Sequence, residues 1–234
     1  MRPWDRYVSE EEQRAYEAAG FGRSAGLGTR PALLIIDVQY RTTGTVPRPF
    51  WEAITEFPTS CGDVAWAAVG HIEQLLELFR RKGWPVVYPH VAPKVASDGG
   101  RLAGKVPAIM TIPAHGYGFV ESVAPKDGDI FQPALLQKVQ PSAFFGTALV
   151  SHLIDLQVDT LVMTGCTTSG CIRASVVDGF SYNFNIAIPE EAVYDRSAAA
   201  HAVNLFDMSQ KYAEVLPMSA MMRMLEATRS GDAR

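Results

Sequence analysis

Cys171 has the sequence context of a catalytic nucleophile. It ends a turn of small and hydroxylated residues, TGCTTSGC, that follows the short apolar run Asp159 to Met163 and precedes a helical pattern that starts at Arg173. The N-terminus of a helix carries a partial positive charge and free amide N–H groups. Because a thiol at that point has a lowered pKa, we expect Cys171 to be an activated nucleophile between a buried strand and a helix.

Two charged residues can be placed at or near the ends of other strands. Asp37 ends the apolar run PALLIIDV, and Lys138 lies in the segment Ile130 to Gln140. If these residues meet Cys171, Lys138 supplies a positive charge beside the thiolate. Asp37 then accepts the thiol proton and returns it to a leaving amine. Backbone N–H groups of the turn would face the developing oxyanion, so this chemistry suits an amide or ureido carbonyl.

Each of these residues also has a plainer interpretation. An Asp at the end of a strand is often a cap or turn residue, and a single Lys is usually solvated. We interpret Cys166 as structural and Cys61 as a core or loop residue, because the cysteine spacing fits neither a redox pair nor a zinc pair. The histidines do not stand at metal-ligand spacing, and the glycine-rich turn lacks the nucleotide-binding patterns. We therefore expect neither a metal nor another cofactor.

The elements that position these residues alternate along the chain. Short apolar runs predict strands, and three- and four-residue apolar spacing predicts helices. The alternation predicts a parallel sheet with helices on both faces, in which functional residues gather at the C-terminal ends of the strands. The predicted strands are residues 31–38, 85–88, 160–163, 184–188 and 213–216, and the predicted helices are residues 64–82, 148–157, 173–179, 199–212 and 218–228.

The chain divides into an arm and a body. Residues 1–30 hold one short capped helix and then several glycines, so we expect an arm that packs on the body or on a neighbouring subunit. Residues 31–234 form the predicted domain, because no linker interrupts them. Residues 39–60 and 91–128 show little periodicity; the first segment is predicted as a long loop and the second as a surface loop with some short helix.

Composition limits the partners. The formal net charge is −4 and no basic stripe is present, so nucleic acid is not an expected partner. No apolar run is long enough to span a bilayer, and the charged N-terminus does not resemble a signal peptide. We expect a cytoplasmic protein that acts on a small molecule.

Three motifs together resemble the isochorismatase-like cysteine hydrolase superfamily. They are PALLIIDVQ around Asp37, KVQPSAFFGT around Lys138 and TGCTTSGCIRAS around Cys171. The resemblance implies a single-domain three-layer α/β/α sandwich with a roughly six-stranded parallel sheet, and a catalytic triad of these three residues. It also implies a cis peptide bond between Cys166 and Thr167, with the N–H groups of Thr167 and Cys171 as the oxyanion hole.

Further segments resemble the branch of N-carbamoylsarcosine and maleamate amidohydrolases. They include EAVYDR (residues 191–196), and the resemblance implies that Arg196 binds a substrate carboxylate, with hydroxyl contacts from Thr167 or Thr168. It also implies a homodimer or homotetramer. Two alternatives stay open: a hydrolase of neutral or larger amides with a structural Arg196, and a catalytically silent binding protein. The long segment 40–61 leaves Asp37 directly, so it should border the pocket and shape its substrate range.

Overall fold

The computed structural model describes residues 2–95, 99–127, 129 and 135–228. Within these residues seven strands form one sheet, in the order β3-β2-β1-β4-β5-β7 with β6 paired to β4. All of the pairings between these strands are parallel. The strands are β1 (Pro31–Ile36), β2 (Val86–His90), β3 (Leu135–Gln137), β4 (Thr160–Cys166), β5 (Asn185–Pro189), β6 (Val193–Tyr194) and β7 (Glu214–Leu216).

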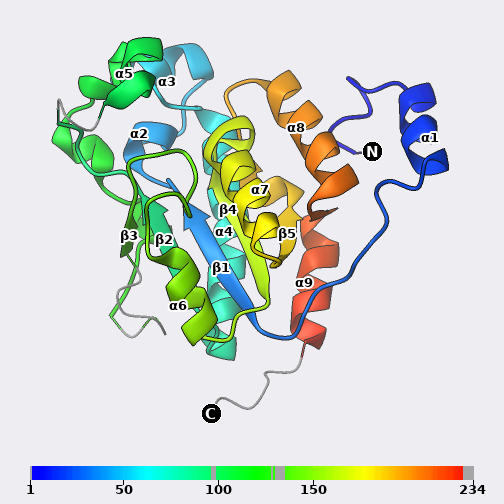
Figure 1. Ribbon diagram of the computed structural model, residues 1–234. Coiled ribbons are helices and arrows are strands. Elements are labelled where there is room, and N and C mark those ends of the chain that lie inside the picture. Colours follow the sequence, from blue (N-terminus) through cyan, green and yellow to red (C-terminus); the bar gives the residue numbers. More distant parts are fainter. Residues whose placement is uncertain (1, 96–98, 128, 130–134, 229–234) are drawn as a thin grey trace.

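Helices cover both faces of the sheet, so the predicted three-layer α/β/α fold is confirmed. In Figure 1, α4 lies behind the sheet and α6 and α7 lie in front of it. The helices are α1 (Glu10–Ala18), α2 (Tyr40–Thr43), α3 (Phe50–Glu56), α4 (Asp63–Lys82), α5 (Gly100–Lys105), α6 (Leu149–Asp155), α7 (Arg173–Ser181), α8 (Ala198–Lys211) and α9 (Met218–Ala227).

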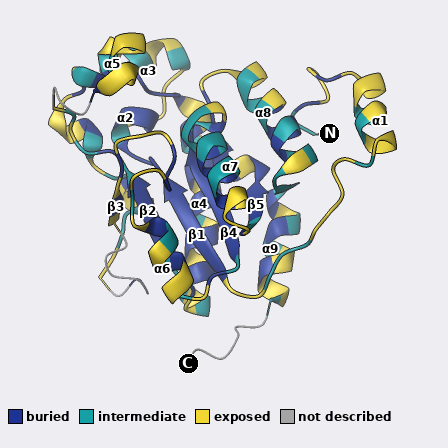
Figure 2. Ribbon diagram, in the orientation of Figure 1, coloured by how far each residue is buried: buried dark blue, intermediate teal, exposed yellow. Residues whose placement is uncertain are grey.

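Strand β1 lies at the centre of the fold and is buried along its whole length. Successive side chains of a strand point to opposite faces, so β1 contributes to two cores. Leu33 and Ile35 pack with α4 and α9, whereas Leu34 and Ile36 pack with α6, α7 and α8. Figure 2 shows the result as buried central strands, β1 and β4 among them, between helices with exposed outer faces. Burial on both faces explains why the PALLII segment is apolar without alternation.

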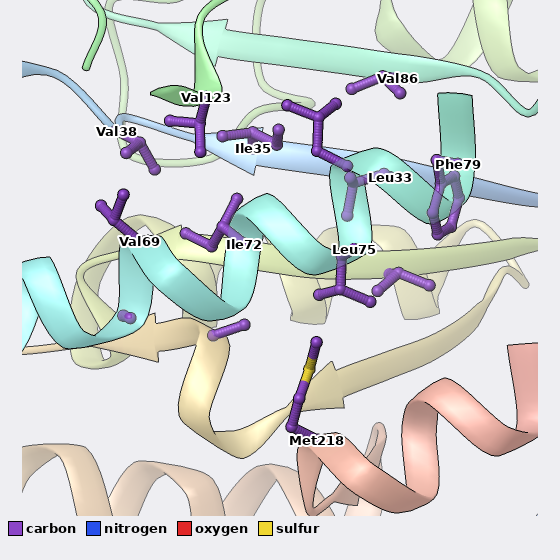
Figure 3. Close-up of a cluster of buried hydrophobic side chains, with 14 of the residues drawn as sticks. Leu33, Ile35, Val38, Val69, Ile72, Leu75, Phe79, Val86, Val123 and Met218 are labelled. Carbon is purple, nitrogen blue, oxygen red and sulfur yellow. The ribbon is translucent and has the colours of Figure 1, made fainter. Parts of the chain in front are cut away.

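Helix α4 supports the back of the sheet with one apolar stripe. Ile72 and Leu75 lie on the side of the helix that faces Leu33 and Ile35 of β1 (Figure 3). The helix ends where Gly83 adopts the left-handed conformation, with φ of 67°. Glycine reaches that conformation without steric cost, which is why it terminates the helix at this point.

The N-terminal arm packs on the body of its own chain. Its helix α1 begins with a capping box between Ser9 and Glu12. Before that helix, Trp4 is buried with its ring edge-on to Phe206 of α8 at 5.8 Å. Arg2 donates from Nη2 to the carbonyl oxygen of Val215 at 2.6 Å. These contacts attach the start of the arm to α8 and β7 of the same chain.

Several predicted boundaries were wrong. The segment 39–60, predicted as a loop, contains the short helices α2 and α3, which have too few turns to show a clear period. Strand β4 runs three residues further than predicted, to Cys166. The short strand β6 was missed, because a two-residue strand leaves no pattern. Residues 130–134 and 229–234, which fall in predicted segments, lie outside the described part of the chain.

Candidate active site

Asp37 lies just beyond the C-terminal end of β1, between β2 and β4. Its side chain is almost fully buried, and its N–H donates to the carbonyl oxygen of Pro89 at 2.9 Å. Its φ is +56°, a left-handed conformation that is unfavourable for a residue other than glycine. Such strain is concentrated at functional sites, where the surrounding structure holds the backbone in place.

Lys138 directly follows the last residue of β3, and its side chain contacts that of Asp37. Its side chain is fully buried, and its Nζ donates to Oδ2 of Asp37 at 2.8 Å. The same Nζ lies 3.4 Å from Sγ of Cys171 and 3.3 Å from the carbonyl oxygen of Gln140. The structure therefore brings Asp37, Lys138 and Cys171 together, with the ammonium group in contact with both of the other side chains.

Cys171 lies in a π-helical turn, Thr168–Ile172, directly before α7. The chain enters this turn through Gly165 at the end of β4, where φ is +100°. A side chain at this position would collide with the backbone oxygen of Ile36 in β1, so the close approach of the two strands requires glycine. The peptide bond between Cys166 and Thr167 is cis.

The charge state of Cys171 differs from the prediction. The pKa of this thiol is raised to about 12: burial is the largest cause, the negative charge of Asp37 adds to it, and Lys138 opposes both effects. The predicted lowering by the helix N-terminus was wrong for the free enzyme, because the thiol is buried beside a carboxylate. The site therefore holds a neutral thiol next to a base.

Lys138 keeps its charge in the same environment. Burial works against the ammonium form, but Asp37 and then Cys171 outweigh it and hold the pKa of Lys138 above its usual value. Oδ1 of Asp37 is buried and accepts no hydrogen bond from the described residues. This carboxylate oxygen is therefore available to accept the proton of the Cys171 thiol.

The turn that carries Cys171 is fixed by side chains from outside it. The N–H and the hydroxyl of Ser169 both donate to Oδ2 of Asp195, at 2.8 and 2.6 Å. The hydroxyl of Thr168 pairs with Nδ1 of His201 at 2.8 Å, and burial lowers the pKa of that histidine. Thr168 is buried, and its hydroxyl group already forms a hydrogen bond with His201. This bond competes with the predicted contact of the hydroxyl group to substrate. Thr167 is half-buried and accepts from Gly170 N–H at its carbonyl oxygen.

A pocket of about 100 Å³ opens onto two of the three residues, Lys138 and Cys171. Cys171 and Lys138 form its floor, and Arg41 and Tyr117 belong to its wall. Arg41 comes from α2, one helical turn after Asp37, and its Nη2 lies 3.8 Å from Oδ1 of that residue. Sequence reasoning missed Arg41. The four-residue spacing from Asp37 could have indicated it, had the segment been recognised as a helix.

Arg196 lies outside this pocket. Its side chain is exposed, and its Nη2 donates to the carbonyl oxygen of Thr59 at 2.7 Å. It therefore braces the segment between α3 and α4. Cys61 and Cys166 are buried and unpaired, as interpreted from the sequence. The pKa of each of these two thiols is raised to about 12, and burial is the largest cause.

Two features are absent from the described residues. No group of three or more His, Cys, Asp or Glu side chains among them could hold a metal ion. No helix in the described ranges is long and apolar enough to cross a membrane.

Comparison with known proteins assigns the family. The model of the isochorismatase domain matches residues 31–220, which include Asp37, Lys138 and Cys171. The chain belongs to the isochorismatase family. The maleamate amidohydrolase of Pseudomonas putida is 37% identical over 212 residues, covering 88% of this chain and 91% of that protein. The N-carbamoylsarcosine amidase of an Arthrobacter species is 31% identical over 220 residues, covering 91% of this chain and 77% of that protein.

Solved structures support the fold of this family member. A cysteine hydrolase from Pseudomonas syringae pv. phaseolicola superposes with a TM-score of 0.76 at 20% identity, covering 89% of this chain and 98% of that chain. An N-carbamoylsarcosine amidase from Thermoplasma acidophilum superposes with a TM-score of 0.63 at 24% identity, covering 81% of this chain and 96% of that chain. At these identities the likeness concerns the fold alone.

Proposed function

We propose that this chain, a hydrolase of the isochorismatase family, cleaves a small carboxylate-bearing amide or ureido compound with Cys171 as its nucleophile. The products are ammonia and the corresponding acid. One observation carries the proposal: the Lys138 ammonium group contacts both the Asp37 carboxylate and the Cys171 thiol. The names of the two relatives, a maleamate amidohydrolase and an N-carbamoylsarcosine amidase, support the substrate class.

The first half of the reaction acylates the cysteine. Asp37 takes the proton from the Cys171 thiol as the sulfur attacks the carbonyl carbon of the substrate. Because the pKa of the free thiol is raised to about 12, proton removal accompanies attack and no stored thiolate is needed. The protonated Asp37 then gives the proton to the departing nitrogen. The carbon–nitrogen bond breaks, ammonia leaves, and a thioester remains on Cys171.

The second half releases the acid. Asp37 takes a proton from a water molecule that attacks the thioester carbonyl, and it returns this proton to the departing sulfur. Lys138 stays charged throughout, since its pKa is held above the usual value. It opposes the build-up of negative charge on sulfur and holds Asp37 in place. The backbone N–H groups of Thr167 and Cys171 are the proposed donors to the oxyanion in both halves.

Mass spectrometry and ammonia release test this proposal together. We expect wild-type protein to release ammonia from maleamate or N-carbamoylsarcosine, within a panel of related amide and ureido acids. Rapid acid quenching should trap an adduct on Cys171 whose mass equals that of the substrate acyl group. Cys171→Ala should abolish both signals, and Cys61→Ala, a buried cysteine outside the pocket, is the matched control. Full turnover by Cys171→Ala would refute the mechanism.

A further inference from the structure

The wall of the pocket contains an arginine that is held from behind by a buried glutamine. The side chain of Gln39 is fully buried, and its Oε1 accepts from Nε of Arg41 at 3.3 Å. The amide group of Gln39 is fixed in turn by the backbone: Nε2 donates to the carbonyl oxygens of Val91 at 2.9 Å and Tyr117 at 2.7 Å. Gln39 thus orients the guanidinium group of Arg41 and ties it to two other walls of the pocket.

The two Nη groups of Arg41 donate no hydrogen bond to other described residues. The contact from Nε to Gln39 is the one hydrogen bond that Arg41 side-chain atoms make within the described ranges. The distance of 3.8 Å from Nη2 to Oδ1 of Asp37 is too long for a hydrogen bond. Cζ of Arg41 lies over the Tyr117 ring, 5.9 Å from its centroid, and this contact occupies none of the N–H donors. Arg41 lines the pocket together with Cys171, so its Nη groups are available to a ligand there.

Arg41 is more than a partner for Asp37. Lys138 already forms a short, fully buried ion pair with that carboxylate. A second cation at 3.8 Å adds little to this pair, and its planar fork of donors suits an incoming anion that both Nη groups can bind. Lys94 also lines the pocket, but it offers a single ammonium group rather than a planar fork, and its Nζ donates to the carbonyl oxygen of Val139. Arg196 lies outside the pocket and donates to Thr59.

We propose that Arg41 is the specificity-determining residue that binds the carboxylate of the substrate in this pocket. The inference rests on the proposed function and names the group that selects its substrate. Arg41 lies 3.8 Å from Asp37 and Cys171 lies 3.4 Å from Lys138, and both line the pocket of about 100 Å³. The site therefore selects short acids, whose carboxylate stands only a few bonds from the amide carbon.

Alkylation of Cys171 tests this role without turnover. Iodoacetate and iodoacetamide transfer similar groups to a thiol, but only iodoacetate carries a carboxylate. The iodoacetate rate is divided by the iodoacetamide rate, first for Cys171 and then for free cysteine. The first quotient divided by the second measures how strongly the pocket attracts the carboxylate. We expect Arg41→Met to lower this normalised ratio about tenfold, the effect of losing a charge-assisted hydrogen bond. The iodoacetamide rate corrects for any change in the thiol itself.

Three further variants complete the experiment. Arg41→Lys keeps the positive charge but lacks the planar fork of N–H donors, so its normalised ratio should lie between those of wild type and Arg41→Met. Arg48→Met removes an exposed arginine and should leave the ratio unchanged. Arg196→Met tests the residue implied by the family resemblance. A wild-type ratio in folded Arg41→Met, or a loss confined to Arg196→Met, would overturn the assignment of Arg41.

Steady-state kinetics separates this inference from the proposed function. For a carboxylated amide, Arg41→Met should raise KM by at least about tenfold, and the rise in KM for a neutral amide of the same length should be much smaller. If wild-type protein releases no ammonia but the alkylation ratio still falls in Arg41→Met, the anion site stands and the proposed reaction fails. If ammonia is released with the same KM by both proteins, the reaction stands and Arg41 is not the anchor.

Discussion

Nζ of Lys138 lies 2.8 Å from Oδ2 of Asp37, and both side chains are completely enclosed by protein. The two residues are 101 positions apart in the chain and come from the ends of β3 and β1. Bringing two charges out of water is costly, and their attraction offsets this cost only while both are present. The pair is therefore a structural unit as well as a candidate catalytic one.

The first prediction concerns the stability of this pair. Lys138→Met leaves the Asp37 carboxylate buried without its partner, so it should lower the free energy of unfolding by about 3–5 kcal/mol. The double variant Asp37→Asn with Lys138→Met should recover much of that loss. Urea unfolding measures both values. Arg81→Met is the control, because its ion pair with Glu226 is exposed and should contribute less than about 1 kcal/mol. Additive effects of the two single variants would contradict the idea of a unit.

The second prediction separates the roles of Asp37 and Lys138 at the thiol. Both Asp37→Asn and Lys138→Gln should reduce turnover by at least about a hundredfold, since each disrupts the proton-transfer step. Their effects on alkylation by iodoacetamide at neutral pH should be opposite. Asp37 raises the pKa of Cys171 and Lys138 lowers it, so the first variant should react faster than wild type and the second more slowly. Changes of the same sign would show that the charges do not act on the thiol in this way.

The third prediction is a pH dependence. Because the pKa of Cys171 is raised to about 12, the thiolate fraction of the free enzyme is small at neutral pH and increases as pH rises. The logarithm of the iodoacetamide rate should rise with a slope of about one between about pH 7 and 10, whereas free cysteine levels off above its pKa of about 8.5. Asp37→Asn should move the plateau to lower pH. A wild-type plateau near neutrality would mean that the thiolate is present before substrate binds.

The positions of the triad follow from the sequence, but its electrostatics do not. The apolar run before Asp37 and the turn before Cys171 place both residues at strand ends, where parallel sheets gather functional groups. The pKa of Cys171 depends on burial and on the distance to Asp37, which spacing along the chain does not contain. Arg41 was missed because α2 has a single turn, and one turn leaves no period to detect. Arg196 was predicted from resemblance alone, which carries no information on its contact with Thr59.

The fourth prediction concerns the arm. Trp4 is buried against Phe206 of the same chain, so Trp4→Ala should lower the free energy of unfolding by about 3 kcal/mol. Tyr7→Ala removes an aromatic ring that is 42% exposed on the same arm, and it should change stability by less than about 1 kcal/mol. Unfolding by urea compares the two variants. Equal losses would show that the arm is not held by Trp4.

The expected homodimer or homotetramer remains a prediction, and light scattering after size-exclusion chromatography measures it. Deleting residues 1–30 should shift the mass if the arm also contacts a neighbouring subunit. Because the arm packs on its own body, its deletion should first lower the melting temperature. A change in mass without loss of stability would assign the arm to the subunit interface alone.

The buried amide of Gln39 has a consequence for how this enzyme could be re-engineered. Asp37 and Lys138 directly follow β1 and β3, and Cys171 lies in the turn between β4 and α7. Gln39 fastens Arg41 to the segments around Val91 and Tyr117, which lie outside the strands. The segment 99–117 thus supplies Leu102, Ile109 and Tyr117 to the lining of the pocket but contains none of the three candidate catalytic residues. Redesign of residues 99–117 with Gln39 left intact should change which amide is accepted and leave the bond-breaking machinery untouched.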